Sequence, residues 1–93
     1  MADYRDLTQE ASHPFSCVIT IPFESHRDAS YAMQTLLVDK ELQPEKIIRE
    51  LRAVENDLIV EFRTTEARLL RAAVSSFYDM VLLIARVLME FEE

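Results

Sequence analysis

The sequence predicts an α+β domain in which a three-stranded antiparallel sheet carries two helices on one face, in the order strand, helix, strand, strand, helix. Three observations lead to this fold. Residues 15–23 and 58–64 alternate between apolar and polar side chains, as half-buried strands do. Residues 26–38 and 66–90 repeat apolar side chains at spacings of three and four, as amphipathic helices do. Short connections that do not cross then place the last strand in the centre of the sheet.

The first strand and the first helix are predicted from the pattern around a proline and a serine. One side of the strand carries four apolar residues: Phe15, Cys17, Ile19 and Ile21. Pro22 stops the strand, and Ser25 with Asp28 forms a capping pair that starts a helix of about four turns. The apolar stripe of this helix consists of Ala29, Ala32, Met33, Leu36 and Leu37.

A polar connection over residues 39–45, which contains Pro44, leads to a predicted hairpin of residues 47–54 and 58–64. The turn falls at residues 55–57, where Asn56 and Asp57 tolerate unusual backbone dihedrals. In the second strand Leu58, Val60 and Phe62 face one way. The first strand of the hairpin is less regular, so we expect it at an edge of the sheet.

One long helix follows Thr64 and Thr65, either of which can cap it, and runs about 25 residues to about Glu90 without a breaker. On a helical wheel a first stripe comprises Leu69, Leu70, Ala73, Val74, Phe77, Met80, Val81, Ile84, Val87, Leu88 and Phe91. Beside it lies a second stripe, Tyr78, Leu82, Ala85 and Met89. The apolar arc spans roughly 200°, whereas about 100° suffices to cover a sheet.

Two arrangements would cover the second stripe: the first helix of the same domain, or another molecule. An exposed apolar patch of several hundred Å² is unusual on a monomer, so we expect a docking surface for another subunit's helices. The second stripe and the end of the helix are sufficient for an interface of ordinary size, about 800 Å² per side.

Composition limits the function. A chain of 93 residues forms one domain, which we place at residues 13–93 behind a flexible N-terminal leader of residues 1–12. The net charge of −7 has the wrong sign for a protein that binds phosphate backbones unaided. Glycine is absent, which excludes the glycine-dependent phosphate loops and the GXXG clamp of RNA-binding domains. The sequence shows no secretion signal and no uninterrupted apolar span. We therefore expect a soluble intracellular protein that does not bind or span a membrane.

Catalytic, metal and cofactor chemistry is not predicted. Cys17 is the only cysteine, so it forms neither an intrachain disulfide nor a thiolate metal cage. His13 and His26 lack a serine or cysteine nucleophile nearby and are expected at the surface. Glu90, Glu92 and Glu93 form a solvated tail. We therefore expect no enzyme, no cofactor and no metal.

Three arginines, Arg63, Arg68 and Arg71, stand close together at a strand end and in the following helical turn. They either converge into a basic corner that contacts acidic residues of a partner or RNA phosphate, or pair with Glu61 and Glu66 at the surface. We favour pairing.

Several strings together resemble the CTAG/Pcc family over about Phe15 to Leu88. They are Ile21-Pro22-Phe23-Glu24, Leu37-Val38-Asp39, Glu41-Leu42 before Pro44, Arg68-Leu69-Leu70-Arg71 and Val74-Ser75-Ser76-Phe77. Arg68, Leu70, Arg71, Ser76 and Phe77 match the helix signature of the family. Many relatives have Asn-Ser where this chain has Ser75-Ser76, which removes an amide from that position.

The resemblance implies a small scaffold or dimerisation subunit of the KEOPS (EKC) complex, in the nucleus and cytoplasm. Such a subunit supports synthesis of threonylcarbamoyladenosine in tRNA without performing the chemistry, and meets tRNA only within the complex. Its implied partners are the Kae-type threonylcarbamoyltransferase and either a second copy of itself or a small Gon-type subunit.

We assign partner binding to nine residues: Tyr78, Leu82, Ala85, Met89, Arg68, Arg71, Ser76, Met33 and Leu37. A small RNA-binding module that contributes tRNA contacts is the alternative, because the order of strands and helices loosely resembles RNA-binding folds. The acidic charge and the absence of glycine speak against it.

Overall fold

A computed structural model describes residues 12–39 and 41–91 of the chain. Its elements confirm the predicted order and are β1 (Phe15–Pro22), α2 (His26–Val38), β2 (Ile47–Val54), β3 (Asp57–Thr64) and α3 (Ala67–Phe91). Almost all of the predicted leader, residues 1–11, lies outside the described residues. The predicted boundary between leader and domain therefore stays a prediction.

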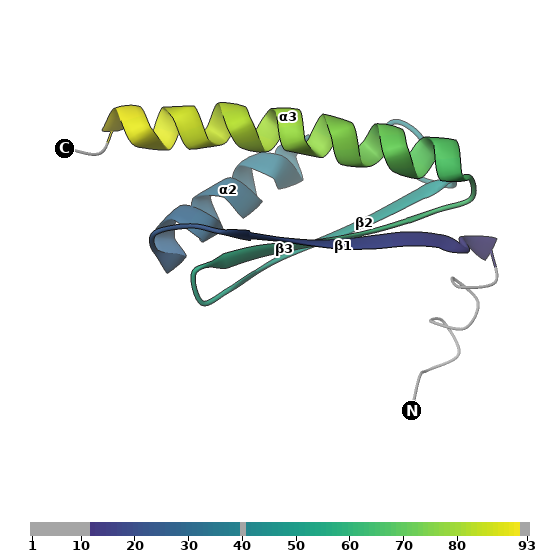
Figure 1. Ribbon diagram of the computed structural model, residues 1–93, viewed down its shortest axis with the longest axis horizontal. Coiled ribbons are helices and arrows are strands. Elements are labelled where there is room, and N and C mark those ends of the chain that lie inside the picture. Colours follow the sequence, from purple (N-terminus) through teal and green to yellow (C-terminus); the bar gives the residue numbers. More distant parts are fainter. Residues whose placement is uncertain (1–11, 40, 92–93) are drawn as a thin grey trace.

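The three strands form one antiparallel sheet in the order β1-β3-β2 (Figure 1). β3 is the central strand and β2 lies at an edge, both as predicted. Val60 of β3 stands opposite Ile19 of β1 and Leu51 of β2, which fixes the register of the sheet. Both helices cover the same face of the sheet (Figure 1), where α3 packs on β3 and β1 and α2 packs on β2 and β3.

The core lies between this face and the two helices. Every second residue of β3 is buried, Thr64 included, because successive side chains of a strand point to opposite faces. The ring of Phe62 meets that of Phe77 on α3 edge to face, with centroids 5.7 Å apart. Around this pair Ile19, Leu36, Ile47, Leu58, Val60, Leu69, Val81 and Ile84 form the buried cluster.

Each end of α2 is fixed by a hydrogen bond from outside the helix. The side-chain oxygen of Ser25 accepts the backbone N–H of Asp28 at 3.1 Å, as the capping pair predicts. At the other end the guanidinium of Arg49 on β2 donates to the carbonyls of Leu36, at 3.1 Å, and Asp39, at 2.8 Å. The Leu36 carbonyl also accepts the backbone N–H of Asp39 at 3.1 Å, so the guanidinium of Arg49 is a second donor to that carbonyl.

The turn between β2 and β3 differs from the prediction. The left-handed conformation falls on Glu55, with φ at 54°, and not on Asn56 or Asp57. The carbonyl of Glu55 accepts the ring N–H of His26 on α2 at 2.5 Å, and the carbonyl of Asn56 accepts the backbone N–H of Phe23 at 2.8 Å. Hydrogen bonds from α2 and from the residue that follows β1 thus hold the turn, and local sequence preference does not reveal them.

The start of α3 also differs from the prediction. The carbonyl of Glu66 accepts the first helical bond, from the N–H of Leu70 at 3.2 Å, so the helix begins after Glu66. The Thr64 hydroxyl donates to the Glu66 carbonyl at 2.7 Å, while the backbone N–H of Thr65 donates to the carbonyl of Lys46 at 3.1 Å. The two threonines therefore bond to Glu66 and Lys46, and neither of them is the N-cap of α3.

Candidate functional site

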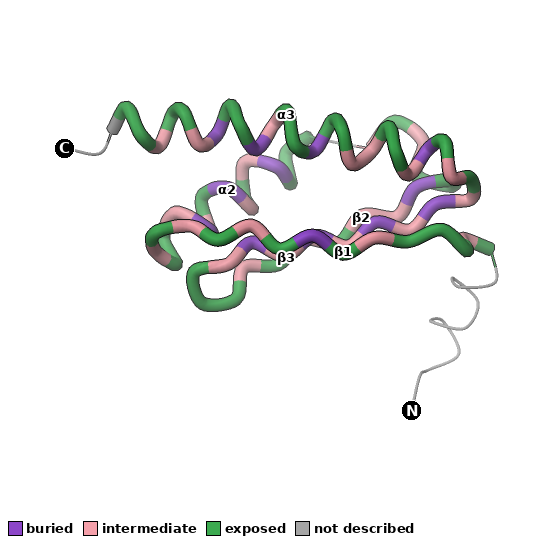
Figure 2. The backbone as a smooth tube through the Cα atoms, in the orientation of Figure 1, coloured by how far each residue is buried: buried purple, intermediate pink, exposed green. Residues whose placement is uncertain are grey.

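The site is the long helix α3, which the sheet supports along part of its length. A helix of 25 residues is about 38 Å long, whereas a strand of 8 residues spans about 27 Å. α3 packs on β3 and β1, while α2 packs on β2 and β3. One side of α3 is buried by this packing and much of the rest is exposed (Figure 2).

The second stripe is exposed, as the partner arrangement requires. Tyr78 is 44% exposed, Leu82 57% and Met89 71%, while Ala85 is half-buried. Ala85 and Met89 border a hollow whose opposite wall includes Pro22, at the end of β1. The arrangement in which α2 covers this stripe is therefore wrong, because these side chains remain open to solvent within their own protomer.

The opposite side of α3 also exposes apolar side chains, and the wheel does not predict this. Leu83 belongs to neither predicted stripe and is 55% exposed. Val87, placed by the wheel among residues that cover the sheet, is exposed and borders a hollow beside Ser25 and Tyr31 of α2. α2 leaves Leu83 and Val87 uncovered. α3 therefore has two exposed apolar flanks, one formed by the second stripe and the other by Leu83 and Val87.

The two residues assigned to partner binding on α2 have different environments. Met33 is half-buried and packs against the core, whereas Leu37 is 54% exposed. Val38 and Leu42, which follow Leu37 around the end of the helix, are exposed as well, Leu42 at 93%. The end of α2 and the connection after it therefore expose an apolar surface made of Leu37, Val38 and Leu42.

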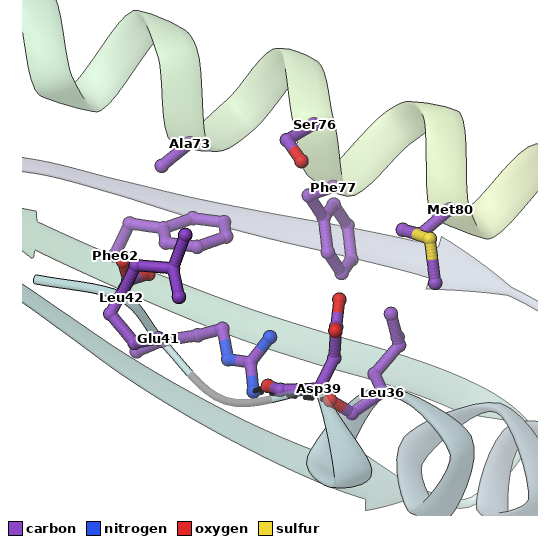
Figure 3. A pocket seen from close by; sticks show the side chains of 10 residues that line it. Leu36, Asp39, Glu41, Leu42, Phe62, Ala73, Ser76, Phe77 and Met80 are labelled. Atoms are coloured by element: carbon purple, nitrogen blue, oxygen red, sulfur yellow. Dashed lines mark hydrogen bonds between the residues drawn. The ribbon is translucent and has the colours of Figure 1, made fainter.

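A cavity of about 280 Å³ separates this end of α2 from α3 (Figure 3). Its residues come from the end of α2 and the following connection, from the sheet and from α3: Leu36, Asp39, Glu41, Leu42, Arg49, Phe62, Ala73, Ser76, Phe77 and Met80. Figure 3 shows the carboxylate of Asp39 directed towards Phe77 on the facing helix. Ser76, assigned to partner binding from the sequence, is exposed and lines this cavity.

The three arginines do not converge. Arg63 alternates with the inward-facing Phe62 and therefore lies on the sheet face that turns away from the helices. It pairs with Glu61 at 3.1 Å. Arg68, on α3, pairs with Glu66 at 3.4 Å. The expected pairing is confirmed for these two arginines, and the basic corner is not formed.

The histidines and the cysteine occupy structural positions. The ring of His13 bonds to the carbonyl of Glu45 at 3.0 Å, and His26 bonds to the hairpin turn. Cys17 is half-buried on the helix-facing side of β1. In the part of the chain that the structure describes, no three His, Cys, Asp or Glu side chains are grouped so that they could hold a metal ion.

By length and apolar composition alone, residues Ala67–Glu90 of α3 meet the requirements of a membrane-spanning helix. Arg71, Asp79 and Arg86 interrupt its apolar residues, so the helix contains no uninterrupted apolar run of that length. Core helices of soluble proteins pass the same test, and one side of α3 packs on the sheet. We attribute the apolar character of α3 to the core and to its two exposed flanks.

A small α+β domain, with exposed apolar flanks on its longest helix, has the features of an interaction subunit. The family model described as "Transcription factor Pcc1" matches residues 16–89, which is most of the chain. The chain belongs to the Pcc1 family. This confirms the family resemblance found in the sequence.

Similar proteins carry related names. The chain is 33% identical over 73 residues to the EKC/KEOPS complex subunit PCC1 of Saccharomyces cerevisiae. This alignment covers 78% of the present chain and 83% of the relative. The chain is 34% identical over 84 residues to the subunit of the same name in Debaryomyces hansenii, with 90% of this chain and 82% of the relative covered. An EKC/KEOPS complex subunit of Schizosaccharomyces pombe is 32% identical over 71 residues, or 76% of this chain and 81% of the relative.

One solved structure is similar over nearly the whole fold. A chain in the crystal structure of the binary complex Gon7-Pcc1 superposes with a TM-score of 0.81 at 30% identity. The match covers 87% of this chain and 100% of that chain. The complex joins a protein of this fold to a second, different protein.

Proposed function

We propose that this chain is a non-catalytic scaffold subunit of a KEOPS complex that supports threonylcarbamoyladenosine modification of tRNA. Membership of the Pcc1 family and the names of three relatives as EKC/KEOPS subunits support the assignment to that complex. The chemistry belongs to another subunit, and this chain meets tRNA only within the assembled complex. The complex acts in the nucleus and the cytoplasm, and its work requires no membrane.

The observation that carries the proposal is the exposed second stripe of α3. Large apolar side chains on a helix lose hydrophobic stabilisation when they remain in water, at about 25 cal/mol for each Å² of apolar surface. Leu82 and Met89 are more than half exposed, and no other helix or strand among the described residues covers them. A partner that buries about 800 Å² of this side would recover that stabilisation and form an interface of standard size.

Two flanks on opposite sides of one helix suit a scaffold that holds two neighbours at once. We propose that the helices dock the Kae-type threonylcarbamoyltransferase, and that a separate surface binds a second copy of this chain or a small Gon-type subunit. The similar solved structure, a Gon7-Pcc1 complex, supports the second assignment. Arg68, Arg71, Ser76, Met33 and Leu37 are proposed as contributors to these contacts.

The test has two parts. The size of the isolated chain is measured in solution, and one residue of the second stripe is replaced. Replacing Leu82 by Asp should abolish co-purification with the Kae-type subunit or association with the small partner, because a charge would be buried in the interface. Val18, on the far face of the sheet and 61% exposed, supplies the matched control Val18→Asp. Thermal unfolding of both variants checks that the fold survives.

Two results would overturn the proposal. One is an isolated chain that stays a soluble, well-folded monomer at high concentration and binds neither partner. The other is Leu82→Asp and Met89→Asp variants that co-purify with both partners as the parent does. Tight binding of tRNA by the isolated chain at physiological salt would favour the RNA-binding module instead.

A further inference from the structure

We propose that the cavity between the end of α2 and α3 receives the side chain of a lysine or arginine from a partner protein. The inference rests on the proposed function, because it assigns a chemistry to one contact of an interaction subunit. Three features lead to it: the apolar walls of the cavity, the negative charge at its mouth, and the way in which Arg49 is already bound.

The walls suit the aliphatic stem of a long side chain. Phe62 and Phe77 meet edge to face in one part of the cavity, and Met80 lines it from the next turn of α3. Leu42 stands at the border and is 93% exposed, so a stem that enters would cover apolar surface that otherwise faces water. A cavity of about 280 Å³ has room for one such side chain. Lysine and arginine bury their methylene groups in this manner while the charged end stays near the surface.

The mouth of the cavity favours a cation. Asp39 and Glu41 each bring a carboxylate to the lining, and the carboxylate of Asp39 points towards the cavity (Figure 3). The end of α2 adds the negative end of a helix dipole, and the last turn of α2 carries no basic residue to offset it. An ammonium or guanidinium group placed here would meet opposite charge within a partly desolvated site.

Among the described residues that line the cavity, Arg49 is the one positive group, and its position reduces its opposition to a second cation. Its Nη2 atom donates to two backbone carbonyls, those of Leu36 and Asp39, at the end of α2. The guanidinium is therefore committed to the helix end, and its charge is offset by the same dipole. The carboxylates of Asp39 and Glu41 make no recorded ion pair with it among the described residues.

The experiment uses the full chain and small molecules that imitate side chains. Butylguanidinium and butylammonium are titrated into the isotope-labelled protein while amide chemical shifts are followed, with butanol as the neutral analogue and butyrate as the anionic one. We expect the two cations to shift the amides around residues 36–43 and 73–80 with lower dissociation constants than butanol, and butyrate to shift none of them.

A double variant tests the role of charge. Asp39→Asn with Glu41→Gln removes both carboxylates but keeps their shape, and should weaken the binding of butylguanidinium roughly fivefold, as expected for two partly exposed ion pairs. Glu45→Gln with Glu50→Gln removes the same net charge at exposed positions away from the cavity and should leave the dissociation constant unchanged. Circular dichroism of both variants confirms that the helix content is retained.

The proposal fails if butanol or butyrate binds as well as the cations, if the shifts map elsewhere, or if both double variants weaken binding equally. This outcome is distinguishable from failure of the proposed function. If the chain assembles with its partners but binds no cation, the proposed scaffold function stands and the proposed site for a lysine or arginine side chain does not. A chain that binds the cations in the cavity but assembles with no KEOPS subunit keeps the site and loses the scaffold assignment.

Discussion

The two helices cover the same face of the sheet with side chains of different size. α2 packs through Ala29 and Ala32, both with no exposed surface, and through Leu36, which is 1% exposed. α3 packs through large residues such as Phe77 and Val81. Small side chains let α2 approach the strands closely, and its inward side is fully used by the sheet. α3, by contrast, packs on β3 and β1 and carries apolar residues beyond those that the sheet can bury.

The difference separates two tasks within one layer of helices. The inward stripe of α2 serves the fold, whereas α3 serves the fold and, in the proposed function, also the contacts with other molecules. Substitutions on the buried side of either helix should therefore cost stability, and substitutions on the flanks of α3 should cost assembly. Measurements of the free energy of unfolding, made at one protein concentration for all variants, can break or sharpen this comparison.

The largest loss is expected for Phe77→Ala. Phe77 is 4% exposed and meets the ring of Phe62, so its truncation leaves a void and should cost about 3–5 kcal/mol of the free energy of unfolding. Leu82→Ala on the same helix removes a residue that is 57% exposed and should change it by less than about 0.5 kcal/mol. Urea denaturation measures both. Equal losses at the two positions would show that α3 does not have separate buried and exposed sides.

A smaller loss is expected when α2 is forced away from the sheet. Ala32→Leu adds three carbon atoms where no surface is exposed, and overpacking of this kind costs about 1–3 kcal/mol. Ala72→Leu, at an exposed position of α3, is the matched control and should be nearly neutral. If Ala32→Leu is as stable as the parent in urea denaturation, the close approach of α2 is not required by the fold.

The starts of the helices provide the third comparison. Ser25→Ala removes the oxygen that accepts the N–H of Asp28, and loss of such a cap costs about 1 kcal/mol. Thr65→Ala should cost less, because α3 begins after Glu66 and Thr65 contributes its backbone N–H, which alanine keeps. Thermal unfolding followed by circular dichroism ranks the two variants. A larger loss for Thr65→Ala would assign the cap of α3 to the threonine.

The smallest effect is expected at the exposed start of α3. Arg68 pairs with Glu66 at 3.4 Å, but its side chain is 75% exposed, so Arg68→Ala should change the free energy of unfolding by less than about 0.5 kcal/mol. The remaining difference should vanish in 1 M salt, where charges at this separation are screened. A loss that persists at high salt would show that Arg68 stabilises the fold by packing.

The fold was predictable because its periodic patterns are strong. Alternation in residues 58–64 matches the burial of β3, and the alternation of residues 17–22 matches β1, although Phe15 at the start of that strand is exposed. Local details were less accessible. Glu55 takes the left-handed turn position, and the turn is bonded to His26 of α2 and to Phe23, which follows β1; such contacts do not appear in a local pattern.

The candidate site was predictable on one flank of α3 and missed on the other. Tyr78, Leu82 and Met89 stood out because they extend the apolar arc beyond what one sheet needs. Leu83 lies alone within a polar arc of the wheel, so a search for stripes passes over it. The cavity beside Ser76 is lined by residues that are far apart in the sequence, such as Leu36, Phe62 and Met80, and no local pattern brings these together.

The order of the strands also affects how the molecule is made. β2 and β3 are neighbours in sequence and can pair as soon as both are formed, which for a hairpin takes microseconds. β1 must wait for β3, because Phe15 pairs with Thr64 across the whole of α2 and β2. During synthesis on the ribosome, which proceeds at about 5–20 residues per second, the backbone of β1 therefore spends several seconds without the strand that it pairs with. An unpaired strand edge is open to aggregation during that interval.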